Sequence, residues 1–431
     1  MNVWHMIRDL FRHEQELLRA LPRNARVLLG TSSIFVFAMP VINIFVSAFI
    51  MRNSQDVVKV MAFQLASYTG VPVTFYVNGL LLRRFNAATL YAAGMALSGC
   101  VLFVLTSLAA LELTGILVAG LTMGVAIGLH WANRNLLSLA NTRDVFRNYY
   151  FAIEGLFYCV SGVVVPAAVG AFISWSGTGL GPDAGANMAY RIVAGAVLLL
   201  ALAATWMITR GDFERVPAPV GIALRFDRIW CGLLTLSVFK GVVQVFQSAL
   251  PVMLVMQMLG DREHVLGAVQ SAGALIAAGL VYLVGRNTRP CHRLGVFGVA
   301  LVIYAFGAGL NACWFAPWSV LFFVVCFLVS QPLAELAFSP IQLLVMDRAV
   351  RRDGSCGYAY LCGYEMGLYA GRLFGGGVFI GVALFFSGVL ALRYVLIALA
   401  LLQLVSLPVA RAVVAALRAE DFEVERRSRE E

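Results

Sequence analysis

The feature that most constrains this chain is a series of apolar blocks, each roughly 18–25 residues long. Examples cover residues 27–51, 87–110 and 192–209. A helix of this length crosses the ~30 Å hydrocarbon core of a bilayer, and all of its backbone polar groups bond within the segment. Charged residues make up only 13% of the sequence, against roughly 25% in soluble domains. The sequence therefore predicts an all-α integral membrane protein.

The apolar blocks and the loops between them predict twelve transmembrane helices. We place them at residues 27–51, 57–82, 87–110, 115–138, 149–173, 188–209, 229–257, 264–284, 294–312, 316–346, 357–386 and 389–415. Lys and Arg gather in cytoplasmic loops of membrane proteins. With the amino terminus inside, most of the 32 Lys and Arg residues fall on the cytoplasmic side. Both termini are therefore predicted to be cytoplasmic, and the net charge of +9 reflects topology rather than a nucleic-acid partner.

Residues 1–26 lack the apolar core and small-residue cleavage site of a signal peptide. Trp4, Phe11 and Leu18 recur there at helical spacing with arginines between them, which predicts an amphipathic helix on the membrane surface. An unstructured tail is the alternative. The eight cysteines include no CxxC pair, so neither a metal site nor a disulfide framework nor a cofactor is predicted.

The two halves of the chain repeat each other. Pro40 and Pro251 lie 211 residues apart in the first and seventh segments, and Glu154 and Glu365 lie 211 apart in the fifth and eleventh. A link with two prolines follows the sixth segment, where two halves should join. The predicted organisation is an amphipathic segment (1–26), a six-helix bundle (27–209), a cytoplasmic linker (210–228), a second six-helix bundle (229–415) and a cytoplasmic tail (416–431).

Short motifs add a family resemblance. The loop after the second segment holds Gly79, Arg83 and Arg84, which is similar to the G-x-x-x-D-R motif of the major facilitator superfamily, with Arg83 in place of the acid. With its six-plus-six plan the chain resembles that family over nearly its whole length. The resemblance implies two pseudo-symmetric bundles that rock about a central site, and a monomer. The acid helps to latch the cytoplasmic side in the family, so its replacement leaves that contact unassigned.

Ionisable groups inside apolar segments are the sharpest functional signal. Each costs roughly 2.5–3.5 kcal/mol at the middle of a membrane helix and rarely faces lipid. Six such residues are present: Arg134, Glu154, Lys240, Glu335, Glu365 and Arg372. Matching depths suggest the pairs Arg134–Glu154 and Glu335–Arg372, as part of a site or as struts between helices. Glu154, Glu335 and Glu365 are candidates for proton coupling or gating.

A polar stripe marks the seventh segment, because Lys240, Gln244 and Gln247 share one helix face. We predict that this stripe lines a substrate cavity, although Lys240 has the alternative of a structural partner in Glu335 or Glu365. His130 and Arg134 share a face by their i, i+4 spacing. The predicted substrate-binding residues are Lys240, Gln244, Gln247, Asn43, His130, Arg134 and Arg372; no catalytic or metal-binding residues are predicted.

These features predict a secondary active transporter of a small, anionic or zwitterionic organic solute in the inner membrane, coupled to a proton or a counter-solute. No G-x-x-x-x-G-K-[ST] loop is present, so no ATP-driven pump is expected. Gly162, Pro166 and Gly170 are similar to a motif of family exporters, which favours export. The alternatives are an importer of a nutrient or siderophore-type solute, a membrane-embedded enzyme acting on lipid-linked substrates, and a receptor or channel. The partners expected are the solute, the proton or counter-solute, and membrane lipid.

Overall fold

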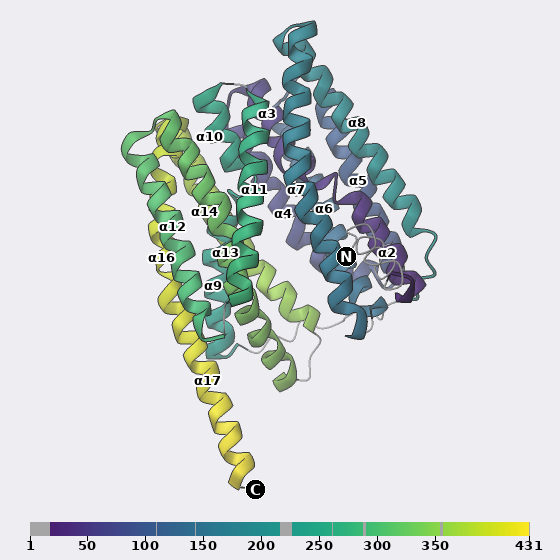
Figure 1. Cartoon of the computed structure of the whole chain (residues 1–431), viewed down its shortest axis with the longest axis vertical. Coiled ribbons are helices and arrows are strands. Elements are labelled where there is room, and N and C mark those ends of the chain that lie inside the picture. Colours follow the sequence, from purple (N-terminus) through teal and green to yellow (C-terminus); the bar gives the residue numbers. More distant parts are fainter. Residues whose placement is uncertain are drawn as a thin grey trace, which may run out of the picture.

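The computed structural model is built of helices (Figure 1). It describes residues 18–108, 110–142, 144–215, 226–260, 262–287, 290–353 and 357–430, and no strand occurs among them. Consecutive helices run in nearly opposite directions. The short connections between them therefore alternate between two ends of the molecule (Figure 1). We call the end where α3 meets α4 the distal end, and the end toward which α17 runs the proximal end.

The first half of the chain forms α2 (Arg23–Phe35), η1 (Val41–Phe45), α3 (Val46–Ser54), α4 (Val57–Leu81), α5 (Ala87–Ser107), α6 (Leu113–Asn141), α7 (Asp144–Leu180) and α8 (Pro182–Ile208). The second half forms α9 (Arg228–Gln244), α10 (Ala249–Leu259), α11 (Glu263–Asn287), η2 (Pro290–His292), α12 (Arg293–Trp314), α13 (Pro317–Asp353), α14 (Gly357–Phe385), α15 (Gly388–Leu390), η3 (Ala391–Val395), α16 (Leu396–Leu404) and α17 (Ser406–Glu430).

Ten helical stretches in the described part of the chain are long and apolar enough to cross a membrane, and 41–54 is a shorter apolar helix. Two of the twelve predicted segments fall outside those ten. The first is divided among α2, η1 and α3, and the second, α4, carries Gln64, Ser67 and Tyr68 in its middle. These polar side chains lower the hydropathy of α4. They line a cavity rather than face lipid, which explains why they occur in a membrane helix. The fold is the predicted one, with two six-helix bundles.

Each half packs through its own helix contacts. α4 lies against α6 and α5 against α8 in the first half, while α14 lies against α9 and α12 against α13 in the second. The glycines of α14 show how close this packing is. A Cβ added at Gly371 would lie 1.9 Å from the backbone oxygen of Val238, and one at Gly375 would lie 2.6 Å from that of Val242. The glycine repeat of α14 therefore serves close approach to α9 inside one half.

The repeated prolines interrupt two helices at corresponding places. Val36–Ala38 forms turns between α2 and η1, shortly before Pro40, and Val245–Ser248 forms turns between α9 and α10, shortly before Pro251. Proline has no N–H to donate and crowds the preceding turn, which favours an interruption of the regular helix just before each of these positions. The π-helical turn η1 follows Pro40. π-Helical turns are frequent at functional sites. Both interruptions place polar groups near the middle of the molecule.

The predicted terminal segments are only partly described. Residues 1–17 and most of the link at 216–225 lie outside the described residues, so the amphipathic helix and the linker stay predictions. The start of the link contacts the first half, where Asn24 Nδ2 donates to the Asp212 backbone oxygen at 2.6 Å. At the other terminus α17 continues as helix to Glu430, beyond the predicted start of the tail at 416.

Candidate functional site

A cavity of about 700 Å³ lies where the two halves meet. Its lining comes from both halves: η1, α6 and α7 on one side, and α11, α13 and the α9–α10 break on the other. Most of the wall is apolar, but four side-chain amides enter it from four places, namely Asn43, Gln247, Gln270 and Gln331. Trp131 stacks on Tyr158 with ring centroids 6.3 Å apart and forms an aromatic wall. An apolar pocket with a few converging polar groups is typical of small-molecule sites.

A second, more polar cavity of about 350 Å³ adjoins the first, because Asn43, Ile127 and Trp131 line both. Its polar lining includes Gln64, Ser67, Tyr68, Asn135, Gln244, Ser248, Glu365 and Arg372. Two of the predicted substrate-binding residues, Asn43 and Gln247, therefore face the larger cavity, and Gln244 and Arg372 face the polar one. We call the two cavities together the central cavity.

Arg372 is the cation of the central cavity, and it is 4% exposed. Its Nε and Nη2 both donate to Gln244 Oε1, at 3.2 and 2.8 Å. Its Nη1 reaches Glu365 Oε2 only at 3.4 Å, and its guanidinium carbon lies 4.5 Å from the ring centre of Tyr68. One edge of the guanidinium thus meets a neutral amide oxygen where a carboxylate would accept both hydrogen bonds.

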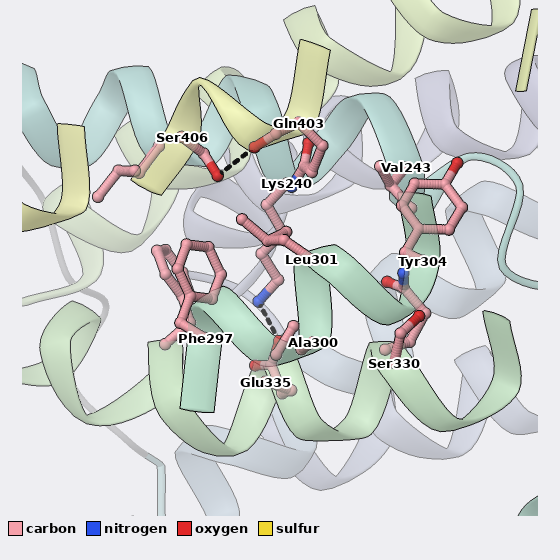
Figure 2. Close-up of a pocket in the computed structure, with 14 residues that line it drawn as sticks. Lys240, Val243, Phe297, Ala300, Leu301, Tyr304, Ser330, Glu335, Gln403 and Ser406 are labelled. Atoms are coloured by element: carbon pink, nitrogen blue, oxygen red, sulfur yellow. Dashed lines mark hydrogen bonds and ion pairs between the residues drawn. The ribbon is translucent and has the colours of Figure 1, made fainter. Parts of the chain in front are cut away.

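Lys240 lies elsewhere, within the second half, and 24% of its side chain is exposed. Its Nζ is 2.6 Å from Glu335 Oε2, beside a small cavity of about 40 Å³ between α9, α12, α13 and α16 (Figure 2). Gln331 lines both this cavity and the large one, and Glu335 follows it by one helical turn. Lys240 therefore has the structural partner that the sequence left as the alternative, and its role in substrate binding stays a prediction.

The depth match between Glu335 and Arg372 does not correspond to a contact. Glu335 of α13 turns toward α9 and pairs with Lys240, whereas Arg372 of α14 turns toward Gln244 and Glu365. Depth along a helix says nothing about which face a side chain occupies, so two charges at one level can point to different neighbours.

The match between Arg134 and Glu154 does correspond to a contact. The guanidinium meets both carboxylate oxygens, with Nε to Oε1 at 3.1 Å, and only 3% of the Glu154 side chain is exposed. Arg134 also lies 5.4 Å from the Trp131 ring centre, so the pair supports the aromatic wall of the large cavity. This bidentate geometry joins α6 to α7 inside the first half.

His130 is enclosed by aromatic rings. Phe35 and Tyr91 lie 4.8 and 5.0 Å from its ring centre, and Trp131 lies 5.2 Å away. Its side chain is 3% exposed, neither ring nitrogen has a hydrogen-bond partner among the described residues, and it lines neither part of the central cavity. The shared face with Arg134 does not bring the two side chains to one ligand position, so substrate binding by His130 stays a prediction without a cavity to support it.

The halves touch closely at the distal end between α7 and α11. A Cβ at Gly170 would lie 2.3 Å from the Glu263 backbone oxygen, and one at Gly267 would lie 2.1 Å from that of Pro166. Glu263, at the start of α11, also accepts a hydrogen bond from Arg52 Nη1 of α3 at 2.6 Å. Further toward the proximal end, a Cβ at Gly155 would meet nothing within 4 Å. The central cavity is thus closed distally along this flank.

The opposite flank, between α4 and α14, is joined over most of its length. Tyr369 Oη contacts Thr69 Oγ1 at 3.2 Å in the middle. Near the proximal end the Tyr358 hydroxyl donates to the Phe75 backbone oxygen at 2.7 Å, and the two rings stack. Arg83 and Arg84 form no ion pair with a described residue. The Tyr358 hydrogen bond is a contact between the halves near this end, and the contact of the altered loop motif stays unassigned.

A charged cluster outside the apolar segments fastens the proximal end of the second half. Arg348 of α13 pairs with Asp227 before α9 and with Glu420 of α17. Asp227 also accepts from the Trp230 N–H at 2.8 Å and so caps α9. Burial alone would raise the pKa of Asp227, but the hydrogen bonds from Arg348 and Trp230 and the charges of Arg348 and Arg352 together lower it.

Sequence reasoning missed several cavity residues. Gln64, Gln270 and Gln331 lie inside apolar helices, and Tyr68 lies beneath Arg372. The available signal was an uncharged amide in an apolar segment, which is costly to bury without partners. Gln64, Gln270 and Gln331 carry no charge and lie outside the polar stripe of the seventh segment, so no prediction covered them.

Known proteins resemble this chain in sequence only distantly, and no known family profile matches it. An uncharacterised protein in the sodM 3' region of Geobacillus stearothermophilus is 23% identical over 152 residues, which cover 35% of this chain and 71% of that protein. The uncharacterised protein YqgE of Bacillus subtilis is 24% identical over 149 residues, which cover 34% of each chain. The chain thus matches about a third of the length of YqgE.

Solved structures resemble it much more completely. The nucleoside transporter NupG superposes with a TM-score of 0.64 at 14% identity, over 91% of this chain and 99% of that one. A POT family transporter in complex with a thioalcohol-conjugated peptide gives 0.65 at 12% identity, over 93% and 99%. A bacterial homologue of the human lysosomal transporter Spinster, inward-facing and unoccupied, gives 0.55 at 12% over 91% and 96%. The chain is therefore a multi-pass helical membrane protein with the fold of the major facilitator superfamily.

Proposed function

We propose that the protein is a secondary active transporter that carries a small organic solute across the inner membrane by alternating access. The observation that carries this proposal is the central cavity, which lies between the two halves and is closed by the α7–α11 contact at the distal end. We take the proximal end, where α2 begins and α17 ends, as cytoplasmic because of its arginines. The structure is then the state in which the outer gate is shut.

The charge distribution of the central cavity supports a substrate that bears a carboxylate. The Nε/Nη2 edge of Arg372 meets Gln244 Oε1, and a carboxylate in that place would accept both hydrogen bonds and add charge attraction. Glu365 lies beside it at the long distance of 3.4 Å, where it would attract an ammonium group of a zwitterionic solute. The body of the solute would then occupy the larger cavity against Trp131, with the amides of Asn43 and Gln247 as hydrogen-bonding partners.

Glu365 is the acid that we propose for coupling. Both carboxylate oxygens of Glu154 accept hydrogen bonds from Arg134, and Glu335 pairs with Lys240 outside the central cavity. Only Glu365 shares a cavity with Arg372, so protonation of Glu365 and binding of an anion at Arg372 affect each other's charge balance directly. We propose that the driving partner is a proton or a counter-solute, that the protein works as a monomer, and that it exports its solute; import of a nutrient or siderophore-type solute is the alternative.

The test is saturable counterflow in proteoliposomes with a panel of amino acids, monocarboxylates, dicarboxylates and uncharged analogues of equal size. We expect carboxylates to exchange and their amides to fail. Gln244→Glu should abolish exchange, because its carboxylate would occupy the Arg372 edge permanently, while the smaller Gln244→Ala should retain it. Arg393→Gln, a change outside the cavity, is the control. If uncharged analogues exchange as well as carboxylates and Gln244→Glu is active, the site assignment fails.

Direction and coupling need two further readouts in the same vesicles. A pH gradient should drive net movement of the exchanging solute by wild type. Glu365→Gln should keep counterflow and lose the response to the gradient, because exchange needs no net proton transfer. Uphill movement out of the cytoplasmic compartment would support export, and movement in the other sense would support import. Absence of counterflow for every class, with an intact fold, would overturn the transporter proposal itself.

A further inference from the structure

A separate cavity of about 500 Å³ lies at the distal end of the first half, away from the central cavity. It is formed where α3 ends, α4 begins, α5 passes into α6, and α8 begins. Two cations line it, Lys59 from α4 and Arg191 from α8, together with a single acid, Glu112. The amides of Asn53 and Asn187 are also in its wall, and they bond to each other at 3.1 Å.

The two cations have donors left over. Lys59 Nζ donates to the Leu111 backbone oxygen at 3.0 Å, and Arg191 Nε donates to the Thr106 backbone oxygen at 3.1 Å. Neither side chain pairs with an acid in the described part of the chain. A lysine offers three N–H donors and an arginine five. Both terminal nitrogens of Arg191 and two hydrogens of Lys59 therefore remain available for an anion in this cavity.

The surroundings of the cavity are apolar and exposed. Met188 and Ile192 flank Arg191 on the same face of α8 and are each 49% exposed, and Leu113 at the start of α6 is 48% exposed. Exposed apolar side chains of membrane-spanning helices face lipid chains. Arg191 thus lies where a lipid-facing surface meets the helix ends, which is the level of phospholipid headgroups.

We propose that this cavity binds the phosphate diester headgroup of a membrane phospholipid, with Lys59 and Arg191 as the phosphate ligands. Two cations against the one acid Glu112 leave the cavity wall with a net positive charge, which suits a phosphate because a phosphate accepts several charge-assisted hydrogen bonds. The apolar rim of Met188, Ile192 and Leu113 would then receive the acyl chains. Because the site joins α4, α8 and the α5–α6 connection, a bound lipid would hold these parts of the first half together at the distal end.

A purely structural role for Arg191 is separable from this one, since the second half contains a counterpart. Arg393, in η3, donates from Nε to the Ala312 oxygen at 2.7 Å and from Nη2 to the Cys313 oxygen at 2.9 Å, at the end of α12. Arg191 likewise donates to the end of α5. Both arginines cap the carbonyls of a helix end, but only Arg191 shares a cavity with a second cation. Arg393→Gln is therefore the matched control for loss of the cap.

The experiment uses the full chain, purified in detergent and stripped of lipid. Binding of short-chain phosphatidylglycerol, short-chain phosphatidylcholine and inorganic phosphate is measured by native mass spectrometry and by the shift in melting temperature. Each basic group near an anionic headgroup contributes roughly fivefold to affinity, so Lys59→Gln with Arg191→Gln should bind phosphatidylglycerol roughly 25-fold more weakly. Lys59→Arg and Arg393→Gln should bind it like wild type.

The outcomes separate the sources of phosphate. Preference for phosphatidylglycerol over inorganic phosphate, lost in the double variant alone, supports the lipid site. If inorganic phosphate shifts the melting temperature as much as phosphatidylglycerol does, the lipid proposal is overturned and the cavity is a site for a free anion. Equal binding by the double variant and wild type would overturn the role of both cations. An equal loss in Arg393→Gln would show that helix capping, rather than ligand contact, explains the effect.

Discussion

The two flanks along which the halves meet are built differently. α7 and α11 touch through backbone at Gly170 and Gly267 near the distal end, and they separate toward Gly155. α4 and α14 stay joined by side chains, ending with the Tyr358 hydrogen bond near the proximal end. By the twofold repeat these flanks are counterparts, since α4 corresponds to α11 and α14 to α7. If the protein works by the proposed alternating access, the distal α7–α11 contact has to open during the cycle, whereas the α4–α14 side chains are also in contact toward the proximal end.

The largest expected effect comes from the ion pair that joins the halves distally. Glu263 and Arg52 expose only 2% and 8% of their side chains, and removing one partner of a buried pair costs about 3–5 kcal/mol. Because the pair crosses between α3 and α11, the cost falls on the distally closed state. Glu263→Gln should therefore populate a distally open state and slow transport.

The measurement is labelling of Cys159, which lines the large cavity, by an impermeant maleimide in a chain whose other cysteines are serine. Labelling from the outer side should rise in Glu263→Gln. Asp183→Asn is the control, since Asp183 touches Arg52 at 3.4 Å but is 90% exposed. Unchanged labelling in Glu263→Gln would mean that this pair does not close the distal end.

The glycine contact of the same flank should give the next effect. A leucine at Gly170 would drive its Cβ to 2.3 Å from the Glu263 backbone oxygen, and overpacking of this kind costs about 1–3 kcal/mol. Gly170→Leu should thus favour the distally open state by roughly 5- to 150-fold, from the same cost. Gly155→Leu, with nothing within 4 Å of its Cβ, should leave the closed state intact. Equal maleimide labelling of the two variants would contradict the asymmetry of this flank.

The Tyr358 contact tests the other flank, with a smaller effect. Tyr358→Phe removes one hydrogen bond to the Phe75 oxygen and keeps the ring stacking, a loss of about 0.5–1.5 kcal/mol. If α4–α14 is the side that stays together, exchange should change by less than ~10-fold, which corresponds to 1.4 kcal/mol. A collapse of transport in Tyr358→Phe would instead make this contact a gate.

Much of the fold was predictable from sequence because lipid permits few solutions. Apolar length, arginine placement and the 211-residue repeat led to the twelve segments and the two halves. The repeated Pro40 and Pro251 also lie next to both helix interruptions that border the cavity. These predictions depend on distances along one chain, which a sequence contains directly.

The site was only partly predictable, because it depends on which face each side chain occupies. Arg134 and Glu154 are 20 residues apart on consecutive helices, and they meet as expected. Glu335 and Arg372 match in depth and yet turn to different neighbours. Helix rotation is fixed by packing across the whole bundle, such as the glycines of α14 against α9, and a single sequence does not state it.

The smallest effect on transport is expected from the charged cluster inside the second half, which neither flank includes. Asp227 has a lowered pKa in the fold, so its contribution to stability is present above its unfolded pKa, near 3.8, and is lost as pH falls through the lowered folded value. Asp227→Asn should lower the melting temperature at neutral pH, and its difference from wild type should shrink as pH falls below about 4. Counterflow should change little, because the cluster joins α9, α13 and α17 within one half. A strong loss of transport with an unchanged melting temperature would mean that these helices move relative to one another during the cycle. The second half would then not move as a rigid body.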